Sequence, residues 1–156
     1  MTSSRHKEHY QKAILYAERL LKIRLRSEKE IREKLQLRQY SDGIVKRILS
    51  EYKDLGLIDD RQFAEIWIAA RLRRPFGLQR ITRELIQKGI DKEIIAQEIA
   101  HATAQYSEKD IVMDLAQRRA KKYKDIDKTK IKQRVYGYLN RRGFHSSAIF
   151  QALKEL

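Results

Sequence analysis

The fold is decided by a stretch in the middle of the chain, residues 81–99, which reads ITRELIQKGIDKEIIAQEI. Counted from Ile81, apolar residues or glycine stand at offsets +4, +8, +9, +13, +14 and +18. Apolar residues four apart share one face of an α-helix, and a glycine just past a helix permits a left-handed C-cap. The stretch therefore predicts two amphipathic helices joined by a tight corner at Gly89.

The same offsets recur on both sides of this stretch. Counted from Ile31 and from Val135, they again select apolar residues or glycine, and only Gln39 breaks the pattern. The three starting points lie 50 and 54 residues apart. Any amphipathic helical protein gives one such match, but three matches at the same offsets favour true repeats over a single globular bundle. The matching residues are Leu35, Tyr40, Ile44, Val45 and Leu49 in the first unit, and Leu139, Gly143, Phe144, Ala148, Ile149 and Leu153 in the third.

A further helix is predicted before each pair. Helix starts are marked by residues that accept hydrogen bonds from free backbone N–H groups, and Ser27 with Glu30 forms the pattern of a capping box. The other predicted helix starts are Ser41 or Asp42, Asp59, Asp91, Ser107 and Asp127. In the second unit, the residues predicted to point inward from this first helix are Phe63, Ile66, Trp67 and Ala70.

The chain is therefore predicted to be all-α, with three tandem three-helix modules in an elongated, solenoid-like arrangement. We expect a basic N-terminal tail over residues 1–9, the first helix from about Tyr10, and modules over residues 10–55, 56–105 and 106–156. Composition agrees with this class. The 156 residues include only six Gly and one Pro, too little turn chemistry for a sandwich or barrel.

Composition also excludes several kinds of function. The chain has no cysteine, which removes disulfides, thiolate catalysis and zinc fingers. Its apolar runs are far shorter than the roughly 20 residues that cross a bilayer, so we expect a soluble, cytoplasmic protein without a membrane segment. The glycine spacing matches no dinucleotide or phosphate loop, and Asp59-Asp60 is better explained as a helix start than as a metal site. We expect no catalytic residues, no metal and no cofactor.

Charge points instead to a polyanionic partner. The net charge is +14, of which residues 1–55 carry +6, residues 56–105 carry +1 and residues 106–156 carry +7. Basic outer modules around a nearly neutral centre suggest that the ends contact phosphates while the middle module docks. A base-reading helix-turn-helix is poorly supported, because the third helix of the middle unit carries Asp91, Glu93 and Glu98. The candidate binding residues for such a partner are Arg71, Arg73, Arg74, Arg83, Lys88, Arg118, Arg119, Lys121, Lys122, Lys128, Lys132, Arg141 and Arg142.

One motif adds a resemblance to a known family. The stretch Gly56-Leu57-Ile58-Asp59-Asp60-Arg61-Gln62-Phe63-Ala64 resembles the core motif of the RecX family of bacterial recombination regulators. Ser27-Glu28-x-Glu30-Ile31-x-x-x-Leu35 looks like the first-module motif of the same family. The match to the core motif continues through Trp67, Ile68, Arg71, Arg73, Arg74, Phe76, Gly77, Ile81, Glu84-Leu85 and Lys88-Gly89-Ile90.

The resemblance implies a partner that charge alone does not reveal. Members of this family bind RecA recombinase filaments on single-stranded DNA, lie in the helical groove of the filament, and suppress its ATPase, strand-exchange and coprotease activities. We accordingly expect a monomeric, nonenzymatic regulator that contacts RecA and single-stranded or duplex DNA, with the corner from Arg71 to Gly77 facing the protein. Two alternatives stay open: a nonspecific DNA-binding protein, and a helical-repeat adaptor for an acidic protein.

Overall fold

The computed structural model of the chain describes residues 2–156, with side chains from residue 7 onwards. Over this range the chain forms nine α-helices and no strand. None of these helices has both the length and the apolar character needed to span a membrane. The helices are α1 (Thr2–Ile23), α2 (Glu28–Leu37), α3 (Asp42–Asp54), α4 (Asp60–Leu72), α5 (Leu78–Gln87), α6 (Lys92–Ala102), α7 (Glu108–Ala120), α8 (Lys128–Arg141) and α9 (Ser146–Lys154).

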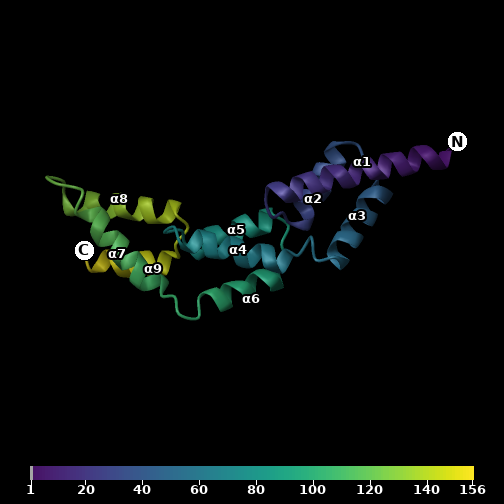
Figure 1. The fold of residues 1–156 in the computed structure, drawn as a ribbon. Coiled ribbons are helices and arrows are strands. Elements are labelled where there is room, and N and C mark those ends of the chain that lie inside the picture. Colours follow the sequence, from purple (N-terminus) through teal and green to yellow (C-terminus); the bar gives the residue numbers. More distant parts are fainter. Residues whose placement is uncertain (1) are drawn as a thin grey trace.

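The helices form three successive groups along an elongated molecule, with the two ends of the chain far apart (Figure 1). We call them module 1 (α1–α3), module 2 (α4–α6) and module 3 (α7–α9). Each module encloses its own small hydrophobic core. The starting positions of the three repeats, Ile31, Ile81 and Val135, are all fully buried. The predicted all-α repeat architecture is thus confirmed.

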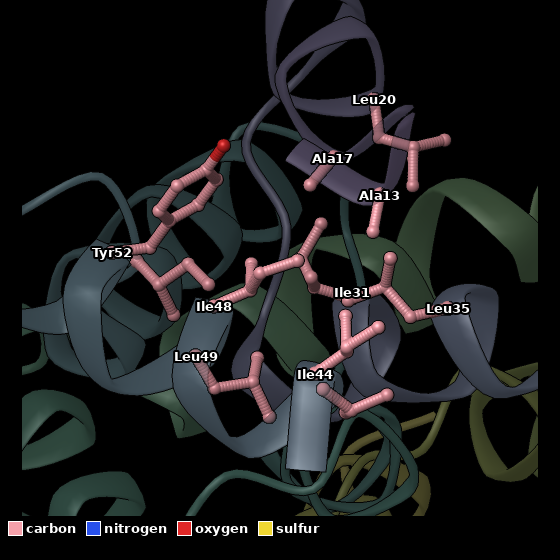
Figure 2. Close-up of a cluster of buried hydrophobic side chains, with 11 residues drawn as sticks. Ala13, Ala17, Leu20, Ile31, Leu35, Ile44, Ile48, Leu49 and Tyr52 are labelled. Atoms are coloured by element: carbon pink, nitrogen blue, oxygen red, sulfur yellow. The ribbon is translucent and has the colours of Figure 1, made fainter. Parts of the chain in front are cut away.

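The core of module 1 shows how the apolar faces of the three helices pack together. Figure 2 shows Ala13, Ala17 and Leu20 of α1 facing the apolar residues of the following helix pair. The small alanines let α1 approach closely, while the branched residues fill the space between the helices. The labelled residues of the pair are Ile31 and Leu35 from α2, and Ile44, Ile48, Leu49 and Tyr52 from α3.

The corner between the second and third helix is left-handed in all three modules. At offset +8, Gly89 has φ +78° and Gly143 has φ +81°, as the sequence predicts. Gln39, which breaks the sequence pattern, adopts the same conformation with φ +61°. A side chain makes this conformation costly, so the surrounding packing imposes the corner geometry on module 1.

Two predictions about first helices differ from the structure. Helix α1 begins at Thr2, whereas the sequence predicts a tail over residues 1–9 and a helix from about Tyr10. An ion pair between Lys12 and Glu8 supports the added turns. In α4, Ile66 is 51% exposed and Ala70 is also exposed, so the prediction that they point inward is wrong.

The buried face of α4 differs from the predicted one because this helix packs mainly against α6. Helix α4 contacts both α5 and α6. Its fully buried residues are Ala64 and Ile68, together with nearly buried Phe63. The buried side of α4 therefore carries Ala64 and Ile68 in place of the predicted Ile66 and Ala70.

Both junctions between modules are built in the same way. At the first junction, the Ser27 hydroxyl donates to the carbonyl oxygen of Lys88 at 2.7 Å. At the second, the backbone N–H of Gly77 donates to the carbonyl oxygen of Arg142 at 2.8 Å. Ser27 and Gly77 share repeat offset −4, and Lys88 and Arg142 share offset +7. The corner of each later module thus docks on the start of the second helix of the module before it.

Glycine permits this close approach. A Cβ placed on Gly77 lies 2.1 Å from the Gly143 carbonyl oxygen, which is inside van der Waals contact. A Cβ on Gly89 lies 2.6 Å from the Cβ of Lys29 across the first junction. Both junctions consequently require residues without a side chain at the point of contact.

Candidate nucleic-acid interface

The candidate site begins on module 2 with Trp67, the one tryptophan of the chain. Its half-buried ring stacks on Phe63, with the ring centres 5.6 Å apart. Two cations lie over the ring: the Arg71 guanidinium at 4.5 Å and the Lys88 ammonium at 5.2 Å from its centre. The indole therefore presents cations rather than a bare aromatic surface.

Glu84 of α5 holds the side chains around Trp67 in place. Its carboxylate accepts hydrogen bonds from Trp67 Nε1 at 3.0 Å, from Arg71 Nε at 2.6 Å and from Arg80 Nε at 3.0 Å. Partial burial by itself raises the pKa of Glu84, but the hydrogen bonds from Arg80, Arg71 and Trp67 outweigh it, and the pKa is lowered. Glu84 stays ionised and holds two arginines and the indole in place.

Phe76 contacts cations from both module 2 and module 3. Three guanidinium groups surround its half-buried ring: Arg80 at 4.2 Å, Arg71 at 5.7 Å and Arg142 at 5.8 Å from the ring centre. Arg142 comes from the corner of module 3, and its Nη1 also donates to the carbonyl oxygen of Pro75 at 3.0 Å. The module junction and the cation cluster therefore share residues.

Module 3 continues the alternation of rings and cations. The guanidinium groups of Arg142 and Arg119 each lie 4.7 Å from the centre of the Tyr138 ring. Arg119 is also 5.5 Å from the Tyr123 ring and donates from Nε to the Tyr123 hydroxyl at 3.1 Å. A second guanidinium group, that of Arg134, lies 5.3 Å from the centre of the same Tyr123 ring.

These contacts form one uninterrupted series, which we call the cation–aromatic row. Each ring contacts at least two cations, and neighbouring rings share a cation, so the series runs from α4 and α5 to α7 and α8. Guanidinium and ammonium groups bind phosphates, and arginine planes and aromatic rings can stack on unpaired bases. The members are Lys88, Trp67, Arg71, Phe76, Arg80, Arg142, Tyr138, Arg119, Tyr123 and Arg134.

Charge along the row is compensated at one end and free at the other. On module 2, Glu84 pairs with Arg71 and Arg80, and Glu30 pairs with Lys88 at 2.6 Å. Among the described side chains, the salt bridges include none made by the row's three arginines on module 3, Arg119, Arg134 and Arg142. Uncompensated positive charge on module 3 favours phosphate contact there.

Comparison with known families decides which family these modules represent. Residues 13–51 match the model of the RecX first three-helix domain, residues 59–99 the second, and residues 107–153 the third. The three matches together cover most of the chain.

This chain belongs to the RecX family.

Curated RecX relatives match nearly the whole chain. The regulatory protein RecX of Clostridium beijerinckii is 31% identical over 151 residues, which are 96% of this chain and 70% of the relative. That of Chlorobium phaeobacteroides is 36% identical over 146 residues, with 93% of both chains covered. The resemblance found in the motif around Asp59 is thereby confirmed.

Solved RecX structures share the fold. A crystal structure of regulatory protein RecX superposes with a TM-score of 0.83 and 23% identity, covering 99% of this chain and 77% of the other. The crystal structure of RecX from Lactobacillus salivarius gives a TM-score of 0.81 and 24% identity, covering 96% of this chain and 97% of the other. The succession of three-helix modules is therefore the RecX fold.

The structure brings together four of the basic residues predicted as binding residues in this RecX-family chain. Arg71, Lys88, Arg119 and Arg142 lie in the cation–aromatic row. The others lie outside it. Arg118 instead pairs with Asp114 at 2.8 Å. The predicted residues outside the row are Arg73, Arg74, Arg83, Arg118, Lys121, Lys122, Lys128, Lys132 and Arg141.

Sequence reasoning missed other members of the row. It treated Trp67 as packing only, and it left Arg80, Arg134 and Tyr138 out of the site. A usable signal was present in the repeats, because offset +7 is basic in all three RecX modules. Arg38 in module 1 lies 4.6 Å from the centre of the Tyr16 ring, so this module also places its +7 cation over an aromatic ring. The residues at this offset are Arg38, Lys88 and Arg142.

Proposed function

We propose that this RecX-family chain is a nonenzymatic regulator that binds RecA recombinase filaments on single-stranded DNA and inhibits their ATPase, strand-exchange and coprotease activities. It acts as a monomer in the cytoplasm and also has affinity for duplex DNA. Two findings support the proposal: membership of a family whose curated members are named regulatory protein RecX, and the strongly basic character of the chain.

The cation–aromatic row carries this proposal. A filament offers a regulator both a protein surface and a nucleic-acid strand, and the row supplies groups for the strand. Its arginines contact phosphates, and Tyr138 and Phe76 with their attached guanidinium planes offer stacking surfaces to unpaired bases. Because the row crosses a module junction, a strand that follows it contacts two modules at once.

Elongation explains how modest contacts give useful affinity. Once one module contacts the filament, the other modules bind at high effective concentration, since short junctions hold them nearby. A chain bound in this way along the filament obstructs the movements that ATP turnover and strand exchange require. The basic residues outside the row, such as Lys121 and Lys122, then serve as additional phosphate contacts.

The direct test is a titration of the protein into preformed recombinase filaments on single-stranded DNA while ATP hydrolysis is followed. Anisotropy of the same labelled strand without recombinase is measured in parallel. We expect half-inhibition at a concentration well below that needed to coat the bare strand. Inhibition only at coating concentrations makes the chain a competitor for DNA, and no inhibition supports the adaptor for an acidic protein.

A further inference from the structure

Module 3 carries a groove on the side of α8 that is turned away from the row. The row uses Arg134 and Tyr138 of α8, whereas the groove uses Lys132 and Tyr136. Residues two apart on an α-helix point in nearly opposite directions, so the two surfaces lie on different sides of α8. The groove has a volume of about 470 Å³ and is lined by Thr129, Lys132, Gln133, Tyr136, Phe150 and Leu153.

The groove exposes an aromatic residue that lies outside the core of module 3. Phe150 of α9 is 55% exposed, although its neighbour Ile149 is fully buried in the core of module 3. Its ring lies 5.4 Å from that of Tyr136, and together the two rings form an apolar floor. The residues at the same repeat offset in modules 1 and 2 are Lys46 and Ala96. The exposed aromatic residue is therefore particular to module 3 among the three repeats.

The repeats themselves show what lies next to this position in the other modules. In module 2, the groove at the equivalent offsets is lined by Leu78, Thr82 and Ile99, and His145 of the following module borders it. Glu108, the first residue of α7, joins module 3 to this groove of module 2. Its carboxylate accepts a hydrogen bond from the backbone N–H of Leu78 at 3.2 Å.

Module 1 repeats the arrangement with a different acid. Asp60, the first residue of α4, accepts the backbone N–H of Glu28 at 2.8 Å. Glu28 and Leu78 share repeat offset −3. At both junctions, therefore, the following module brings a carboxylate to the start of the second helix of the preceding one.

Module 3 is the last of the three modules described, and its second helix differs from those of modules 1 and 2 at this place. Helices α2 and α5 begin at offset −3, but α8 begins one turn earlier, at Lys128. Offset −3 is now Lys132, inside the helix, where the backbone N–H is used by the helix itself. The Lys132 ammonium replaces it as the group that can pair with a carboxylate.

We propose that this groove of module 3 is the docking site for an acidic protein segment that carries an apolar side chain. The segment binds as the following modules do at the two described junctions: its carboxylate pairs with Lys132, and its apolar side chain covers Phe150 and Tyr136. Lys128, one turn earlier, and the net charge of +7 on residues 106–156 favour an acidic partner. This inference rests on the proposed function, because it assigns the segment to the recombinase subunits of the filament while the row contacts the strand.

The test compares Phe150→Ser and Lys132→Gln with two matched controls, Leu37→Ser and Lys46→Gln. Leu37 is 76% exposed in module 1, and Lys46 is exposed at the repeat offset of Phe150, so the controls remove an exposed apolar side chain and a lysine charge outside the groove. Inhibition of filament ATPase, anisotropy on bare single-stranded DNA and the mass in solution are measured for every variant. Circular dichroism confirms that each variant is folded.

We expect Phe150→Ser to raise the half-inhibitory concentration about tenfold and Lys132→Gln to raise it about threefold, with both controls at the wild-type value. Affinity for bare DNA stays unchanged in Phe150→Ser. Unchanged inhibition by Phe150→Ser overturns the docking site, and an equal loss on bare DNA assigns the groove to nucleic acid. A wild-type dimer that Phe150→Ser dissociates assigns it to a second copy of the chain. A wild-type protein that fails to inhibit filaments overturns the proposed function. The assignment of the acidic segment to the recombinase is then also overturned.

Discussion

The backbone N–H of Gly77 donates to the carbonyl oxygen of Arg142, 2.8 Å away, and this bond joins module 2 to module 3. The side chain of the same Arg142 lies between the rings of Phe76 and Tyr138. The contact that sets the angle between two modules is therefore also the point where the cation–aromatic row crosses from one module to the next.

Substitution of Gly77 by Ala tests this dual role. The added Cβ meets the Gly143 carbonyl group and pushes the corner of module 3 away, which separates Phe76 from Arg142. We expect affinity for single-stranded DNA, measured by anisotropy, to fall by at least about threefold while the helix content stays the same. Gly43→Ala is the control, because a Cβ there meets open space. Wild-type affinity in Gly77→Ala contradicts the coupling of junction and row.

Substitution of Gln39 by Gly is expected to stabilise the protein. Gln39 adopts φ +61°, a conformation in which a side chain costs about 1 kcal/mol, whereas glycine adopts it freely. The free energy of unfolding in urea should rise by about 0.5–1 kcal/mol. Gln36→Gly, at an exposed position in the last turn of α2, should lower it by up to about 1 kcal/mol, because glycine has a lower helix propensity. A loss of stability in Gln39→Gly shows that the corner is held by contacts of the glutamine side chain.

The uncompensated arginines of module 3 should determine the salt dependence of DNA binding. Arg119→Gln combined with Arg134→Gln removes two phosphate-binding groups from the row. On single strands each lost phosphate contact makes the slope of log K against log salt shallower by about 0.7, so we expect a change of about 1.4. Arg118→Gln is the control, because Arg118 neighbours the row but pairs with Asp114. The single variant Arg119→Gln is compared with this control, because each removes one arginine. Equal slopes for the two contradict the claim that the row binds phosphates.

Stability at acid pH should depend on Glu30. Partial burial alone raises the pKa of its carboxyl group, but hydrogen bonds from Arg24 and Lys88 outweigh burial and lower the pKa from 4.5 to about 2. A pKa that folding lowers adds stability above the unfolded value and loses it as pH falls through the folded value. The side chain is 12% exposed, so about 2–3 kcal/mol should disappear between pH 5 and pH 2.

Urea unfolding at a series of pH values checks this window. In Glu30→Gln the carboxylate is absent, and the stability should therefore vary less between pH 5 and pH 2. A pH profile of Glu30→Gln parallel to that of the wild type places the acid-sensitive group elsewhere.

Local features of the RecX modules were predictable, because their causes lie within a few residues. The capping box of Ser27 with Glu30 and the N-caps at Asp59, Ser107 and Asp127 all form as the sequence predicts. Each depends on side-chain to backbone hydrogen bonds over two or three residues. Left-handed corners at Gly89 and Gly143 were predictable for the same reason.

The row was not predictable as a whole, because its contacts join residues far apart in the chain. Arg142 reaches Phe76 across the second junction only once the glycines have brought two modules together. Charge clusters such as Lys121 and Lys122 dominate the sequence, yet they lie outside the row. The position of Ile66 was wrong because the sequence pattern does not reveal that α4 packs mainly against α6.

Inhibition of filament ATPase by a row variant tests the central claim most directly. Wild-type protein, the double variant Arg119→Gln with Arg134→Gln, and the equally charged control Arg118→Gln with Lys109→Gln are titrated into preformed recombinase filaments at moderate salt. We predict that the row variant needs at least about ten times more protein for half-inhibition, while the control matches the wild type. Equal inhibition by the row variant and the control contradicts the claim that the row binds the filament.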